Sequence, residues 1–274
     1  MKKFFMLLGI VMFGMVFYAF SCDDTTSDDG NTTDNGNGSG PDVVLPDNNK
    51  TPDNNKSDDN KTDDGRSSDN KTDDGKTSDN KTDDNTNTSA FTDAEIAKAN
   101  TAANVSSLSQ MEKDIILYCN LARLDGTKFW AEYGKNAKGS TAYVSSLESD
   151  LKATKGLVML EPEKSLMEAA AYHANDMSRN NFFDHTSSDG TSFGNRVYGF
   201  YGGNAIGENI SAGMNTAIGV VMQLLVDDGL SSLGHRKNIL GAKYKAIGVK
   251  TATHSTWRTV TVQDFGDKVI TKME

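Results

Sequence analysis

Apolar residues recur at intervals of three and four along several segments of this chain, the spacing that places them on one face of a helix. This pattern predicts amphipathic helices over residues 108–123 and 216–226, and a weaker version predicts one over 143–153. A further helix begins near Pro162 and carries an apolar stripe made of Leu166, Ala170, Ala174 and Met177. These helices account for most of the apolar residues between 105 and 226.

Near the C-terminus the spacing between apolar residues changes from three or four residues to two. Ile247 and Val249 alternate with small residues, and Val260 and Val262 alternate with polar ones, on either side of the turn "THST". Alternation on both sides of a turn predicts a β-hairpin. The consecutive stretches "DHTSSDGTSFGNRV" and "YGFYGGNAIGENISAG", residues 184–213, precede the last helix and are interpreted as a glycine-rich loop segment. Helices followed by antiparallel strands predict an α+β fold, a sandwich of layers.

The N-terminus shows the pattern of an export signal. Lys2 and Lys3 precede an apolar run over residues 4–20 that is shorter than the ~20 residues of a bilayer-spanning helix, and "AFSCDD" follows. We therefore predict a signal peptide of the lipoprotein type over 1–21, with Cys22 as the lipid anchor that binds the membrane. The chain would then lie at a bacterial cell membrane, either periplasmic or surface-exposed. Plain secretion and an uncleaved anchor are the alternatives.

Acidic repeats follow the signal. "KTDDGRSSDN", "KTDDGKTSDN" and "KTDDN" recur with a ten-residue period, and residues 23–89 contain 18 Asp against seven Lys and Arg. So few apolar residues cannot offset the entropy lost on ordering, which predicts a disordered tether over 22–104. The net charge of −10 belongs to this tether. The remaining domain, residues 105–274, is nearly neutral and lacks the basic surface of a nucleic-acid-binding protein.

Cysteine usage adds one constraint. With Cys22 lipidated, Cys119 has no partner, so no disulfide framework stabilises the domain. Cys119 shares a helical face with Ile115 and Ile116, and it is interpreted as a small apolar core residue rather than a nucleophile.

The candidate chemistry lies in the loop-rich segments. His185 follows "NFFD" at the end of one helix, Glu208 lies inside "GENISAG", and His235 lies in "LGHRKNIL". A carboxylate buried in this apolar, glycine-rich setting needs a partner, because an isolated buried charge is costly. We expect the two imidazoles to converge on Glu208, and Arg236 to point away and either pair elsewhere or brace the loop.

Five motifs carry a family resemblance, namely "YCNLARLDG", "DHTSSDG", "GENISAG", "GHRKNIL" and "VTVQDFG". In this order they resemble the CAP superfamily, which includes cysteine-rich secretory proteins, antigen 5 and pathogenesis-related 1 proteins. The likeness covers most of residues 110–267. It implies a three-layer α-β-α sandwich with a central cavity holding two His and two acidic residues.

By motif, His185, His235 and Glu208 match the cavity residues of that family. Asp228 takes the place of the second acid, and its helical spacing of four from Leu224 agrees. The chain departs from the family pattern by lacking the usual disulfides and by having the shorter Asp in that place. Among the other motif residues, Asn120 and Arg123 match the family's first helix.

Three hypotheses of function remain open. The resemblance favours a binding module, not an enzyme, with a polar His and acid cavity for a small molecule, a lipid or a peptide. Since His185 and His235, with Glu208, are ligand types for Zn²⁺ or another divalent metal, a metal-assisted or acid–base hydrolase is the alternative. The chain contains no HExxH motif. A purely structural His–Glu–His network in a surface interaction protein is the third hypothesis.

Overall fold

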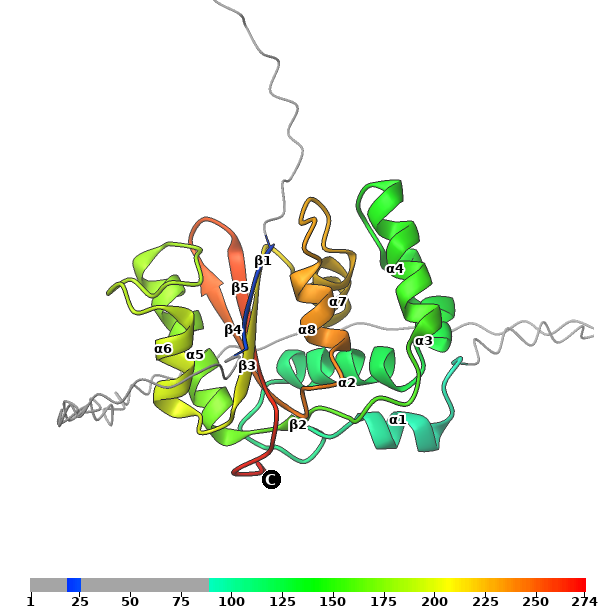
Figure 1. Cartoon of the computed structure of the whole chain (residues 1–274), viewed down its shortest axis with the longest axis horizontal. Helices are drawn as coiled ribbons and strands as arrows, with labels where there is room; N and C mark the ends of the chain where they lie inside the picture. The colour runs from blue at the N-terminus through cyan, green and yellow to red at the C-terminus, as the bar shows by residue number, and fades with distance from the viewer. Residues whose placement is uncertain (1–18, 26–88) are drawn as a thin grey trace, which may run out of the picture. The chain divides into compact units, whose positions relative to one another are not determined.

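A five-stranded sheet forms the middle layer of the fold, with helices on both sides (Figure 1). The computed structural model describes residues 19–25, as backbone, and residues 89–274. The strands lie in the order β1-β3-β5-β4-β2. Their bounds are β1 Ala19–Thr25, β2 Glu161–Pro162, β3 Ala205–Ala212, β4 Ala246–His254 and β5 Arg258–Gly266. Neighbouring strands pair antiparallel except β2, which runs parallel to β4.

The helices differ in length and in the layer to which they belong. In chain order they are α1 Asp93–Ala99, α2 Gln110–Leu124, α3 Gly126–Tyr133, the short 3₁₀ helix Gly134–Asn136, α4 Thr141–Ala153, α5 Lys164–Asn180, α6 Phe193–Phe200, α7 Ala217–Val226 and α8 Gly234–Leu240. Helices α5 and α6 cover one face of the sheet, and α2, α7 and α8 lie on the other side (Figure 1). The predicted three-layer α-β-α sandwich is confirmed.

Separate apolar clusters fill the two sides of the sheet. The larger one joins α2, α4 and α7 to Ile247, Val249 and Phe265 of the hairpin. Two smaller clusters lie between the sheet and the α5–α6 layer, one around Ile206 and the other around Ile210. The sheet therefore has a buried layer on each face, and any polar side chain that it directs inward must find a partner.

Several predicted elements are present where the pattern placed them. The helices expected over 108–123, 143–153 and 216–226 correspond to α2, α4 and α7, and the helix near Pro162 corresponds to α5. The hairpin corresponds to β4 and β5, which pair from Ala246 opposite Gly266 to His254 opposite Arg258.

Other parts of the expectation need correction. The segment interpreted as a glycine-rich loop contains α6 and β3, because Ile206 and Ile210 alternate with small residues and pack beneath α5 and α6. The tether predicted over 22–104 also extends too far. Helix α1 lies within it and packs on α2, with Ala99 and Ala102 buried, so the folded part already includes residues 89–104. The remaining tether prediction, over 26–88, and most of the signal-peptide prediction, over 1–18, fall outside the described residues.

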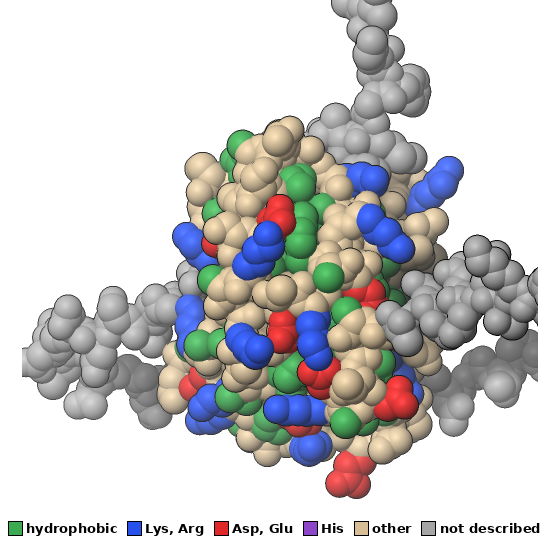
Figure 2. All heavy atoms as spheres, turned by 90° about the vertical axis from the view of Figure 1, so that its right-hand side faces the viewer, with side chains coloured by type: hydrophobic (Ala, Val, Ile, Leu, Met, Phe, Trp, Pro, Cys, Tyr) green, Lys and Arg blue, Asp and Glu red, His purple; other side chains and the backbone are tan. Residues whose placement is uncertain are grey.

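Two surface properties bear on function. Among the described residues, no helix has the length and apolar character needed to cross a membrane. On the face of the molecule shown in Figure 2, basic and acidic side chains are interspersed and do not gather into a field of one sign. This face therefore offers no broad charged patch to a ligand.

Candidate functional site: two buried histidine–acid pairs and an adjoining groove

Strand β3 directs its side chains alternately to the two helical layers, since successive residues of a strand point to opposite faces. Ile206 and Ile210 pack with α5 and α6, so Glu208 between them points to the same layer. Asn209 points the other way, where its side-chain amide donates to the carbonyl oxygen of His235 (3.3 Å) and to Gln263 (3.1 Å). The alternation of side chains along β3 therefore directs Glu208 toward groups of the α5–α6 layer.

On the α5–α6 side, Glu208 forms a buried cluster with His185 and Arg196. The Nδ1 atom of His185 lies 2.7 Å from Oε1 of Glu208, and the guanidinium of Arg196 lies 2.5 Å from Oε2. Glu208 is completely buried and Arg196 is 3 % exposed. The two oxygens of the carboxylate thus have separate partners, an imidazole and a guanidinium.

Arg196 also fixes the loop that carries His185. Its other terminal nitrogen donates to the carbonyl oxygen of His185 (2.8 Å) and to the hydroxyl of Ser187 (3.0 Å). The start of the same loop is held by His173 of α5, whose Nε2 donates to the carbonyl oxygen of Asp184 (2.8 Å). His185 is the partly accessible member of the cluster, with 15 % of its side chain exposed.

The protonation state of Glu208 follows from competing effects. Burial alone would raise the pKa of Glu208, but the hydrogen bond from His185 and the positive charge of Arg196 outweigh it and lower the pKa to about 2. Glu208 is therefore an ionised and very weak base at neutral pH.

Asp264 of β5 lies directly opposite Glu208 in the sheet and is also completely buried. Burial, followed by the negative charge of Glu208, raises the pKa of Asp264 well above its ordinary value. The two acids therefore share one environment and have pKa values shifted in opposite directions, so a second negative charge beside Glu208 is disfavoured.

A second histidine–acid pair lies where α7 leads into α8. Asp227 adopts a left-handed conformation (φ 59°) directly after the last residue of α7, and it is 1 % exposed. Its Oδ1 accepts from Nδ1 of His235 (2.5 Å), and its Oδ2 accepts from the backbone amides of His235 (3.0 Å) and Arg236 (3.4 Å). The carboxylate therefore binds the first amides of α8, where the helix dipole favours a negative charge.

The predicted role of Asp228 is wrong in this structure, and the neighbouring residue takes its place. The side chain of Asp228 is exposed and accepts from the backbone amide (3.0 Å) and the hydroxyl (2.8 Å) of Ser140. The expectation extended the helical spacing from Leu224 beyond Val226, where α7 ends. The left-handed turn at Asp227 breaks that spacing and directs Asp227, rather than Asp228, toward His235.

The predicted convergence of His185, Glu208 and His235 is also not what the structure shows. His185 and Glu208 meet in the α5–α6 layer, whereas His235 meets Asp227 in the α7–α8 layer. Within the part of the chain that the structure describes, no group of three or more His, Cys, Asp or Glu side chains is arranged to hold a metal ion. The donors therefore do not fit the zinc or other divalent metal site that their residue types suggest.

Arg236 points away from Glu208, as expected, and it braces helix α4. It donates to the side chains of Ser146 and Asp150 (both 2.8 Å) and to the backbone carbonyls of Tyr143, Leu225 and Val226. Arg236 is 2 % exposed, so α4 is held against the end of α7 by a buried guanidinium with several partners.

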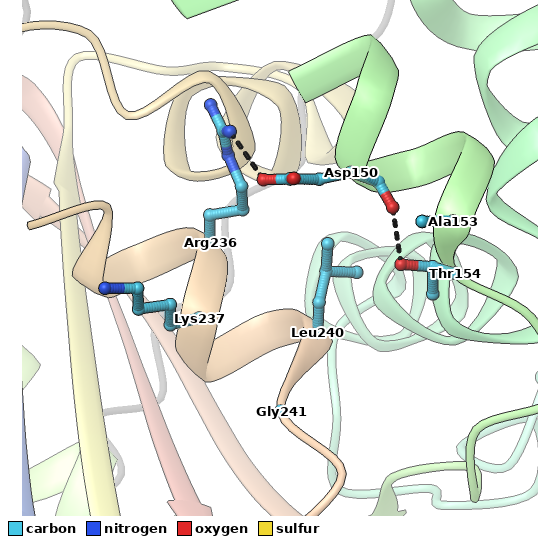
Figure 3. A pocket seen from close by; sticks show the side chains of 7 residues that line it. All are labelled: Asp150, Ala153, Thr154, Arg236, Lys237, Leu240 and Gly241. Atoms are coloured by element: carbon cyan, nitrogen blue, oxygen red, sulfur yellow. Dashed lines mark hydrogen bonds and ion pairs between the residues drawn. The ribbon is translucent and has the colours of Figure 1, made fainter. Parts of the chain in front are cut away.

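A surface groove of about 320 Å³ lies between α4 and α8, beside Arg236. Figure 3 shows Arg236 and Leu240 directed toward α4, with Asp150 and Thr154 on the opposite wall. The residues that line the groove are Asp150, Ala153, Thr154, Arg236, Lys237, Leu240 and Gly241. The groove thus combines an apolar floor with an acidic and a basic group at its rim.

The comparison with known sequence families agrees with the fold. The family model described as "CAP: Cysteine-rich secretory protein family" matches residues 116–265, which is more than half of the chain. The chain belongs to the CAP family. The match begins in α2 and ends in β5, so this CAP domain contains both histidine–acid pairs and the groove.

Individual relatives of this CAP protein are distant. It is 32% identical over 111 residues to the uncharacterized membrane protein YlbC of Bacillus subtilis (strain 168), an alignment that covers 40% of this chain and 31% of that relative. The chain thus spans about a third of the length of that relative.

Two solved structures were also matched at 22% identity. An extracellular protein containing a SCP domain from Bacillus anthracis str. Ames has a TM-score of 0.37 and covers 59% of this chain and 44% of that chain. An outer surface protein from Borrelia burgdorferi has a TM-score of 0.36 and covers 46% of this chain and 90% of that chain.

Sequence reasoning missed three residues of the CAP domain, namely Asp227, which pairs with His235, and Arg196 and Asp264, which lie beside Glu208. Asp264 lies in the quoted motif "VTVQDFG" at the alternation period of Val260 and Val262, which was a usable signal for an inward-facing acid. Asp227 is adjacent to Asp228, the residue that the helical spacing indicated. Arg196 has no comparable signal, because α6 lies in a segment whose glycines indicated a loop.

The remaining candidate, Cys119, is an apolar core residue. It is completely buried, and burial raises the pKa of its thiol to about 12. The structure therefore confirms the interpretation that Cys119 is a small apolar core residue.

Proposed function

We propose that this chain is an exported CAP-domain binding module, and that its ligand, a small molecule, a lipid or a peptide, lies in the groove between α4 and α8. Export is supported by the apolar run over residues 4–20 that follows Lys2 and Lys3, and by a relative described as a membrane protein. Cys22 would be the lipid anchor and would hold the domain at the cell membrane, either periplasmic or surface-exposed.

One observation carries the binding role, which is that both carboxylate oxygens of each histidine–acid pair are already bound within the protein. Glu208 uses both oxygens on His185 and Arg196, and Asp227 uses both oxygens on His235 and the start of α8. These pairs order the loop after α5 and the α7–α8 connection. In the proposal, the Asp227–His235 pair holds the start of α8, one wall of the groove, at the end of α7.

The alternative of a hydrolase receives less support. A general base works best when its pKa is near the operating pH, and the pKa of Glu208 is about 2. His185 remains the group through which catalysis would have to act, because part of its ring is accessible. A direct test should therefore include this residue.

The groove can be tested with a blocking substitution and a matched control on the same helix. Ala153 lines the groove and is exposed, whereas Ala142 is exposed near the other end of α4. Calorimetric titrations of the full chain with short peptides, monomeric lipids and a small-molecule library should find one class that binds saturably. Ala153→Trp should abolish that binding, and Ala142→Trp should leave it unchanged.

Two results would overturn this proposal. Equal binding by both variants would place the ligand outside the groove. Turnover of peptide or ester substrates that is lost in His185→Gln and kept in His254→Gln would establish the hydrolase instead. His254 is a suitable control because its ring is buried on the carbonyl oxygen of Phe182.

The anchor needs a separate test in cells. We expect the chain to partition into the detergent phase after Triton X-114 extraction of a bacterium that expresses it, and to incorporate labelled fatty acid. The Cys22→Ser variant should lose both properties. Retention of the label by that variant would contradict lipidation at Cys22.

A further inference from the structure

The outer edge of β3 is covered by a strand that comes from far away in the sequence. Residues 19–25 form β1 and pair antiparallel with β3 over seven positions, from Ala19 opposite Ser211 to Thr25 opposite Ala205. On its other side β3 pairs with β5. Among the described residues β1 is therefore the strand that completes the sheet at this edge.

The strand β1 spans the boundary at which the sequence predicts cleavage. Removal of residues 1–21 would delete Ala19, Phe20 and Ser21, which pair with Ser211, Ile210 and Asn209. The backbone groups of β3 that face this edge would then lose their partners over that stretch. Unpaired strand edges bind other extended chains readily, because each exposed amide and carbonyl seeks a hydrogen bond.

The sequence of β3 does not protect its edge. Proteins usually guard an edge strand with proline, lysine or an exposed charge, and the segment "AIGENISA" has neither proline nor lysine. Its single charged residue, Glu208, is buried under α6. Helix α8 lies beside β1, so an extended chain at this edge would also contact α8.

We propose that the outer edge of β3 is a docking site for an extended, proline-free segment of a partner polypeptide, which adds antiparallel to β3 in the place of β1. The backbone of β1 shows that the edge and α8 leave room for one strand in this register. Main-chain hydrogen bonds would supply most of the binding free energy, as in other cases of strand addition. This site is separate from the groove, which lies on the α4 side of α8.

Hydrogen–deuterium exchange of β3 amides tests the proposal directly. Two forms of the protein carrying Cys22→Ser are compared, the whole chain from residue 1 and the processed chain from residue 22. The β3 amides opposite Ala19–Ser21 should exchange at least about tenfold faster in the processed chain, whereas β5 amides should be unchanged. Equal exchange in the two forms would show that β1 does not cover the edge and would overturn the proposal.

Peptides added to the processed chain complete the test. The peptide AFSSDDT, which is the β1 sequence with Ser for Cys22, should restore slow exchange on β3. A peptide with proline at the positions of Ser21 and Cys22 should not, since at least one inward-facing amide is lost. Ala153→Trp should leave this docking unchanged, which separates it from binding in the groove. No protection by AFSSDDT, or equal protection by the proline peptide, would contradict strand addition.

Discussion

Glu208 and Asp264 face each other on adjacent strands, both are completely buried, and their pKa values shift in opposite directions, that of Glu208 to about 2 and that of Asp264 well above its ordinary value. The difference arises from their partners. Glu208 is paired with His185 and Arg196, whereas no hydrogen bond to Asp264 from a positively charged group is observed among the described residues. Two acids with opposite shifts in one site form a coupled pair, and the pair gives the fold a measurable pH dependence.

Asp264→Asn should remove part of that dependence. An acid whose pKa is raised by folding stabilises the protein below the pKa of the unfolded chain, here 3.8, and this contribution is lost as pH rises toward the raised pKa. The free energy of unfolding of Asp264→Asn, relative to the wild type, should therefore increase between pH 4 and pH 8. Urea titrations across this range measure it, and a difference that does not change with pH would contradict the assignment.

Arg196→Met should destabilise the domain strongly. The substitution leaves the carboxylate of Glu208 buried without its guanidinium partner, a change that typically costs about 3–5 kcal/mol. Arg179, which is exposed in the last turn of α5, provides the control, and Arg179→Met should change the free energy of unfolding by about 0.5 kcal/mol or less. Similar effects of the two substitutions in urea unfolding at pH 7 would argue against a buried ion pair.

Asp227 and Asp228 form a natural matched pair of adjacent acids. Asp227→Ala removes the acceptor for His235 and for two amides of α8, so it should cost about 2–4 kcal/mol. Asp228→Ala removes exposed hydrogen bonds to Ser140 and should cost about 1 kcal/mol at most. Thermal and urea unfolding give both values. The reverse order would restore Asp228 as the partner of His235.

The thiol of Cys119 should be inert in the folded protein. Its pKa of about 12 and its complete burial leave almost no accessible thiolate. In a chain carrying Cys22→Ser, Ellman's reagent at pH 8 should detect no free thiol until urea is added, and then a single thiol for each chain. Rapid reaction in native buffer would mean that α2 opens locally.

The sequence predicted those parts of the fold in which apolar residues recur at a regular helical or strand spacing. Helices α2, α5 and α7 carry apolar residues at helical spacing, and the β4–β5 hairpin alternates on both sides of its turn. Helices α1 and α6 and strand β3 were missed because local composition indicated tether or loop. Their stability comes from tertiary contacts, such as Ile206 and Val197 packing together, which local patterns do not contain.

The candidate site was predicted in residue type but not in arrangement. His185 and Glu208 do form a pair, as expected from the cost of burying a lone carboxylate. His235 was assigned to the same cavity from its motif, but strand alternation directs Glu208 to the α5–α6 layer and leaves His235 with Asp227. Which layer a residue of β3 faces depends on the register of the sheet, and the short segment "GENISAG" does not specify it.

The separation of the two pairs can be measured with double-mutant cycles on unfolding free energy. His185→Gln and Glu208→Gln should show a coupling energy of at least about 1 kcal/mol, whereas His235→Gln and Glu208→Gln should be additive within about 0.5 kcal/mol. Comparable coupling in both cycles would mean that the two imidazoles share one carboxylate, and it would contradict the arrangement described for this CAP domain.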